Sequence, residues 1–182
     1  VTIAASVLLP GAGSLLANAA LNLADDAVFA MLDVGGGYKS WEEAGLDFGK
    51  KALSSAVNIG VGGVFNGFGG IKTGFFAQGG GLTGLVSSKV GTGTLGVIAT
   101  STMGGIQTLV TSTLNSAVNA FNLTYDKDGN ITGLGWSADS FNAGVQGGLV
   151  SAATGMTSRL TSGLLNNWNA GEKLFGFSQT NQ

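Results

Sequence analysis

Apolar side chains recur every three or four residues along much of this chain, which is the spacing of one face of an α-helix. The pattern predicts a helix over residues 14–32, ended by the three glycines at 35–37, and a second helix over residues 41–57. Ser40 followed by Glu43 matches a capping box, in which each side chain bonds the other residue's backbone N–H. The second helix therefore has a well-defined predicted start.

Glycine interrupts the apolar pattern between residues 58 and 93. Each glycine inside a helix costs about 1 kcal/mol relative to alanine, so an isolated helix is not expected there. Two interpretations stay open. Either the glycines let short helices approach one another closely, or the region is a long apolar loop held against the core. We favour short helices broken at the triple glycine, 79–81.

The most regular helical pattern covers residues 94–121. Its polar side carries hydroxyls and amides but no charges, which suits contact with other protein. The candidate contact residues on its apolar side are Ala99, Met103, Ile106 and Val110.

A last helix is predicted from residue 137 or 139 to about 168, with a polar tail at 170–182 that we expect to fray. Small residues recur along this helix at four-residue steps, a spacing that lets two helix backbones pack closely. The candidate packing residues are Gly144, Gly148 and Ala152, and beside them Gly147, Ser151 and Gly155.

Between the last two helices, residues 122–136 have the pattern of a β-hairpin. The candidate turn contains Asp126, Asp128, Gly129 and Asn130, which are residue types that tolerate tight turns. The predicted fold is therefore mainly α: one domain (1–182), a helical bundle with small-residue helix packing and one hairpin at about 122–136.

The amino-acid composition limits the kinds of chemistry that this chain can perform. Only 10% of the 182 residues are charged, against about 25% in typical globular chains, and glycine supplies 33 residues. There is no cysteine or histidine, so a thiolate metal site, a cysteine nucleophile and a catalytic imidazole are excluded. The net charge is −2 and the basic residues are scattered, which argues against nucleic-acid binding. We expect no enzyme activity, cofactor, metal or small-molecule substrate.

Three weak motifs suggest other chemistry. Residues 67–73 resemble a phosphate-binding loop, but Ile71 stands where the motif needs glycine before the lysine. The aspartates of the predicted turn have the spacing of a calcium loop, but its required glycine and glutamate are missing. Four acidic residues could in principle supply a catalytic carboxylate pair, but helix capping and solvation account for acidic side chains at these positions. They are Asp25, Asp26, Glu42 and Glu43.

The pattern Tyr-Asp-x-x-Gly-Asn-x-Thr occurs once, at residues 125–132. It resembles one unit of the YD repeats of Rhs-type proteins. The Gly/Ala/Ser-rich helices around it are similar to helical linker or pre-toxin segments of large secreted bacterial proteins of the polymorphic-toxin kind. This resemblance implies a non-catalytic spacer or translocation-associated module, located outside the cell or at its surface as part of a larger protein.

The chain begins at Val1 with no basic segment before its apolar start, so no signal peptide is predicted and the chain reads as a segment of a larger protein. We expect a structural, packing or delivery module whose partner is protein, either the rest of the parent chain or a second copy. The alternative is a membrane-inserting, pore-forming or translocation domain, because residues 1–24, 52–71 and 90–125 are uncharged and long enough to cross a bilayer as helix.

Overall fold

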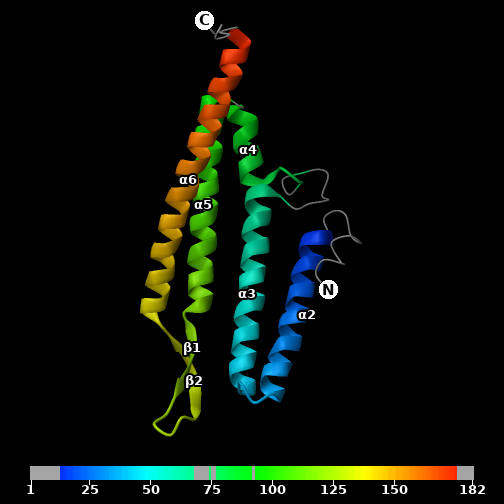
Figure 1. Cartoon of the computed structure of the whole chain (residues 1–182), viewed down its shortest axis with the longest axis vertical. Helices are drawn as coiled ribbons and strands as arrows, with labels where there is room; N and C mark the ends of the chain where they lie inside the picture. The colour runs from blue at the N-terminus through cyan, green and yellow to red at the C-terminus, as the bar shows by residue number, and fades with distance from the viewer. Residues whose placement is uncertain (1–12, 68–73, 75–76, 92, 176–182) are drawn as a thin grey trace, which may run out of the picture.

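The computed structural model describes residues 13–67, 74, 77–91 and 93–175. It is mainly helical and carries one two-stranded antiparallel hairpin, which confirms the predicted fold class (Figure 1). In chain order the elements are α2 (Gly13–Gly35), α3 (Trp41–Asn66), α4 (Gly81–Val90), α5 (Thr94–Asn119), β1 (Phe121–Tyr125), β2 (Ile131–Trp136) and α6 (Ala138–Phe175).

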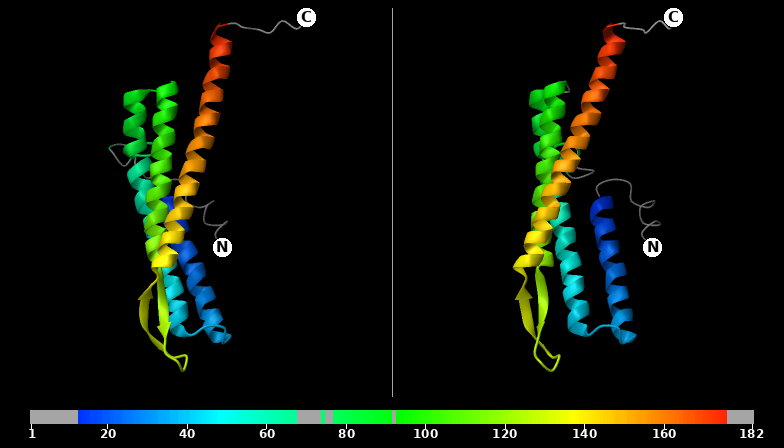
Figure 2. Two further views of the ribbon diagram at one scale, coloured as in Figure 1. Left: turned by 90° about the vertical axis from the view of Figure 1, so that its left-hand side faces the viewer. Right: turned by 60° about the vertical axis from the view of Figure 1, so that its left-hand side comes forward.

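The helices of the bundle are arranged in an open row (Figures 1 and 2). Helix α6 packs on α5, α5 packs on both α3 and α4, and α3 packs on α2. Among the described residues, α2 contacts no helix other than α3, and α6 contacts no helix other than α5. Within the described residues the bundle is therefore not closed around a central core, and α2 and α6 each contact a single helix.

The start of α3 follows the prediction. The Ser40 hydroxyl accepts a hydrogen bond from the Glu43 backbone N–H at 3.2 Å, and the Ser40 backbone N–H donates to the Glu43 carboxylate at 2.9 Å. Both halves of the capping box are present. Since the first helical N–H groups have no partner inside the helix, this exchange supplies two of the missing bonds.

The end of α3 lies beyond the predicted one. The helix continues through Gly60, Gly62 and Gly63 and ends at Asn66, so the expectation that the glycine region would hold only short helices is wrong for its first part. Val61 and Phe65, on the added turns, are buried with exposures of 8% and 6%. Packing of this segment on α5 and α4 thus outweighs the low helix propensity of glycine.

The helical structure is interrupted between α3 and α4. It begins again at Gly81, the last residue of the triple glycine at which a break was predicted. Gly67, the C-cap of α3, has a φ of 72°, and Gly81, the first residue of α4, has a φ of 66°. At Gly81 a Cβ would also lie 2.7 Å from the Phe65 carbonyl carbon. Only glycine combines this backbone angle with so close a backbone contact.

The hairpin has the predicted position. Phe121 pairs with Trp136 and Tyr125 with Ile131, with an irregularity in the register between Thr124 and Tyr125. Gly129 supplies the positive φ of the turn, at 86°. The Trp136 ring meets the Phe121 ring edge-on, with centroids 5.2 Å apart, and so fastens the two strands at the end nearest the helices.

The last helix is longer than predicted, since α6 reaches Phe175. The predicted tail therefore begins as helix, and its remainder, residues 176–182, lies outside the described residues. The first apolar stretch of the chain and residues 68–73 of the phosphate-loop-like motif also lie outside them.

Buried apolar side chains are few and mostly small. The described residues with buried apolar side chains are Ala44, Val61, Phe65, Ala120 and Ala152. None of the large side chains in the described part of the chain is fully buried. The bundle is accordingly held by close backbone contacts and polar pairs more than by a thick hydrophobic core.

Candidate functional site

The closest helix contact is the α5–α6 seam, where small residues of both helices face one another. Gly144 and Gly148 on α6 lie against Ser116 and Ser112 on α5, so that each step of four residues along one helix is matched on the other. A Cβ at Gly144 would lie 2.7 Å from the Ser116 Cβ, closer than carbon atoms pack. Glycine at these two positions sets the distance between the helices.

Further along the seam the partners become larger. A Cβ at Gly105 would lie 2.9 Å from the Met156 methyl group, and Gly163 lies against the Val97 side chain. Ala152 is 6% exposed and completes the buried line. The predicted residues Gly144, Gly148 and Ala152 are thus brought together on the face of α6 that meets α5.

The remaining predicted contact residues on α6 lie off this seam. A Cβ at Gly147 or Gly155 would meet nothing within 4 Å, and Ser151 is exposed. On α5, Ala99 and Met103 are half-buried. Two further α5 residues, Ile106 and Val110, are exposed by 40% and 37%.

The α5 side of the seam was not singled out residue by residue in the sequence. Its buried residues Ser101, Gly104, Gly105 and Ser116 recur at spacings of one helix turn or multiples of it. The signal that could have found them is the same small-residue spacing that marked α6. It was obscured because α5 also carries a strong apolar pattern.

Amide pairs join α3 to α5. The Asn115 side-chain N–H group donates to the Asn58 side-chain oxygen at 3.0 Å. The Asn66 side-chain N–H group donates to the Gln107 side-chain oxygen at 2.9 Å. The two pairs are eight residues apart on each helix. Because a shift of one helix against the other would break both pairs, they specify the register of this contact.

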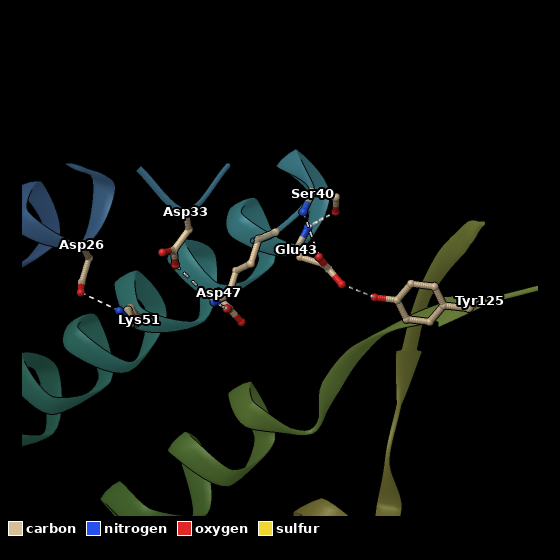
Figure 3. A network of polar contacts seen from close by, with 8 residues as sticks. Asp26, Asp33, Ser40, Glu43, Asp47, Lys51 and Tyr125 are labelled. Atoms are coloured by element: carbon tan, nitrogen blue, oxygen red, sulfur yellow. Dashed lines mark hydrogen bonds and ion pairs between the residues drawn. The ribbon is translucent and has the colours of Figure 1, made fainter. Parts of the chain in front are cut away.

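Ion pairs join α2 to α3 (Figure 3). Lys51 and Asp26 approach to 2.6 Å, and Lys39 lies 2.6 Å from Asp47 and 3.9 Å from Asp33. The Asp47 carboxylate raises the pKa of Lys39 by hydrogen bonding and by charge attraction. These groups are largely exposed, with 40% of the Lys39 side chain and 54% of the Lys51 side chain accessible.

A hydrogen bond ties the hairpin to α3. The Tyr125 hydroxyl donates to the Glu43 carboxylate at 3.0 Å, as Figure 3 shows. The Ser40 backbone N–H, and then this hydroxyl, lower the pKa of Glu43, while acceptance by Glu43 raises the pKa of Tyr125. The capping glutamate thus has a second role, in positioning the β-hairpin.

The turn that resembles a calcium loop is closed by its own hydrogen bonds. The Asp126 carboxylate accepts from the backbone N–H groups of Asp128 and Asn130 and from the Asn130 side-chain amide. The Asn130 side chain is the main cause of the lowered pKa of Asp126. No cluster of three or more acidic residues suited to a metal ion occurs in the described part of the chain.

Four acidic residues were candidates for a catalytic carboxylate pair, and two of them, Asp26 and Glu43, make structural contacts. Asp26 pairs with Lys51, and Glu43 caps α3 and accepts from Tyr125. Glu42 lies beside Glu43 in the first turn of α3. Asp25 lies next to Asp26 on α2, which packs only against α3 among the described elements.

The hollows on the surface of the row include one polar and one apolar depression. A polar trough of about 360 Å³ runs over α5, with Asn66 on one side and Arg159 of α6 on the other. An apolar groove of about 510 Å³ lies between the first half of α3 and the hairpin. Its apolar lining comes from Leu46, Leu53, Val118, Phe121, Leu123 and Leu134.

Large apolar side chains are exposed on several helices. On α2, Val28, Phe29, Met31 and Leu32 are each at least 56% exposed. The exposed apolar residues of α5 and α6 include Leu95, Ile98, Leu114, Leu149, Val150 and Leu165. Within the described ranges, no helix has both the length and the apolar character needed to cross a membrane.

Comparison with protein-family models, curated proteins and solved structures finds no significant match to this chain. The function is therefore inferred from the geometry of the bundle.

Proposed function

We propose that the chain is a non-catalytic assembly module, an open row of helices whose apolar sides are covered by further protein. The observation that carries this proposal is the exposure of large apolar side chains on a bundle with no fully buried large side chain in its described part. Soluble domains bury the apolar face of each element by packing at least two layers together. A single row lacks the second layer.

Helix α2 is the best candidate for a covered surface. Among the described elements it packs on α3 alone, and its exposed residues Val28 and Phe29 each lie one helix turn from Leu32, on one side of the helix. Phe29 is 64% exposed. A contiguous apolar patch of this kind marks a protein or membrane contact on soluble proteins.

The likeness of residues 125–132 to a YD-repeat unit supports placing this module within a large exported bacterial protein, where it would act as a packing or delivery segment. In that setting the second layer is the rest of the parent chain. In the isolated chain a second copy takes the same place, because the exposed apolar side chains remain costly to hydrate.

The test is sedimentation velocity of the isolated chain over a range of concentrations, comparing the wild type with Phe29→Glu. We expect concentration-dependent self-association that Phe29→Glu weakens, with helicity by circular dichroism unchanged. Ala24→Glu, which adds the same charge at an exposed position on the side of α2 away from Phe29, is the matched control and should leave association intact.

A wild-type chain that stays monomeric, with native-like amide protection along α2, would overturn the proposal, because the single row would then be stable uncovered. The same samples are mixed with anionic and zwitterionic vesicles. Co-sedimentation with leakage of vesicle contents would instead favour the membrane-inserting alternative.

A further inference from the structure

The polar trough over α5 contains the only arginine of the chain. Arg159 projects from α6 against Gly104 on α5, and a Cβ at Gly104 would overlap the Arg159 guanidinium. Glycine at this point therefore provides the space that the guanidinium occupies. The side chain extends from α6 to Gly104 on α5 and lines the trough.

The guanidinium has no ion-pair partner among the residues that the structure describes, and no acidic side chain lines the trough. The ion pairs of the described residues lie at the α2–α3 contact instead. A guanidinium presents five N–H donors in a planar fork that matches a carboxylate with two parallel bonds. The trough thus has one strongly cationic end with its donors available.

Two threonines on the wall of the trough have the opposite polarity. The Thr100 hydroxyl donates to the Gly96 carbonyl at 2.8 Å, and the Thr108 hydroxyl donates to the Gly104 carbonyl at 2.9 Å. Each hydroxyl has a single hydrogen, so both threonines present only lone pairs to the trough.

The amide pair at the other end adds to this polarity. The Asn66 amide donates to the Gln107 side-chain oxygen, which leaves the Asn66 oxygen as a further acceptor and the Gln107 side-chain N–H groups as donors. A ligand with a negative end for Arg159 and hydrogen-bond donors facing Thr100, Thr108 and Asn66 therefore complements these groups of the trough.

We propose that the trough binds a small organic carboxylate that also carries hydroxyl or ammonium donors, with Arg159 holding the carboxylate and the α5 threonines accepting from the donors. The volume of about 360 Å³ suits a ligand of the size of a sugar acid, hydroxy acid or amino acid. The sequence predicted no small-molecule substrate, and this ligand is bound without being converted. The site is independent of the proposed assembly through α2.

The test is an NMR titration of the backbone amides at constant ionic strength with three probes, glucuronate, lactate and serine. Glucose, which lacks the carboxylate, and acetate, which lacks the donors, are the controls. We expect at least one of the three probes to give saturable shifts centred on Gly104, Gln107 and Thr108. That probe should bind more tightly than either control.

Two variants assign the binding to the proposed groups. Arg159→Gln removes a charge-assisted pair and should weaken binding about tenfold or more. Lys89→Gln removes one positive charge from α4 outside the trough and should leave binding unchanged. Gly104→Ala displaces the flexible guanidinium and should weaken binding while keeping or raising helicity, since alanine favours helix over glycine.

Absence of a saturable shift with all three probes overturns the proposal. It is also overturned if Lys89→Gln weakens binding as much as Arg159→Gln, since the effect would then be one of net charge. Acetate binding as tightly as the best probe would overturn the donor requirement. If Arg159→Gln fails to fold, the Gly104→Ala result decides.

Discussion

The two ends of the helix row are built in different ways. At the α5–α6 seam, Gly144 and Gly148 let two backbones approach closely, and this part of the contact is lined by small residues. At the α2–α3 contact, exposed pairs such as Lys51–Asp26 connect the helices, while Phe29 and its apolar neighbours stay open to solvent. The difference teaches that close packing of small residues joins α5 to α6, whereas α2 contacts only α3 among the described elements and leaves large apolar side chains exposed.

The physical reason lies in what each contact removes from water. Close packing of small residues gives many dispersion contacts along two long helices without holding flexible side chains in one geometry. Exposed ion pairs gain little, because water and salt screen them and long side chains lose entropy. Stability should therefore be concentrated in the α5–α6 seam.

The largest expected effect comes from filling the seam. Gly148→Leu places a large side chain against Ser112, where even a Cβ would overlap, and should lower the free energy of unfolding by about 3 kcal/mol. Urea denaturation followed by circular dichroism measures it.

The matched control for this substitution is Gly147→Leu, one residue away, where a Cβ meets nothing within 4 Å. It should be neutral or stabilising by up to about 1 kcal/mol, because leucine favours helix over glycine. Equal destabilisation by both substitutions would contradict the assignment of the seam.

A smaller effect is expected at the α2–α3 contact. A double-mutant cycle with Asp26→Asn and Lys51→Met should give a coupling of about 0.5 kcal/mol that declines as salt is added. The same urea method measures it at low and high ionic strength. A coupling above about 2 kcal/mol that is insensitive to salt would show a contact far stronger than exposed pairs provide.

The smallest effect is a pH dependence at the hairpin contact. The pKa of Glu43 is lowered from its ordinary value of 4.5, so the carboxylate stabilises the fold fully above the unfolded-state pKa. That contribution is lost as the pH falls through the lowered, folded-state pKa. The melting temperature of the wild type should therefore decline on acidification.

Glu43→Gln should show a shallower decline over the same pH range, because it lacks the titrating group. Asp126, whose pKa is also lowered, remains in the variant and accounts for part of the residual decline. Identical pH profiles for the wild type and Glu43→Gln would show that the Ser40 and Tyr125 bonds to Glu43 do not contribute to stability.

Local signals predicted the elements well where one short-range interaction decides the structure. The exchange between Ser40 and Glu43 starts α3, and Gly129 with the Asp126 side chain closes the hairpin turn, as their sequence patterns indicated. The small-residue spacing of α6 likewise picked out Gly144 and Gly148, which lie in the α5–α6 seam. Each of these signals is contained within a few neighbouring residues.

Other features had no local signal. Helix propensity argued against the last turns of α3, but burial of Val61 and Phe65 stabilises them, and that burial depends on helices distant in sequence. The spacing on α6 could not separate Gly148, which faces α5, from Gly147, which does not. That choice depends on how α6 is rotated against its neighbour, which only the assembled helices define.

The amino-acid sequence by itself determined the helices, the hairpin and the absence of thiol and imidazole chemistry, because periodicity, caps, turns and composition act locally. Only the tertiary structure decided that the helices form an open row, that Arg159 lies over Gly104, and that the apolar side of α2 has no partner among the described residues. Those facts depend on which helix faces meet, and contact between distant segments is a property of the whole fold.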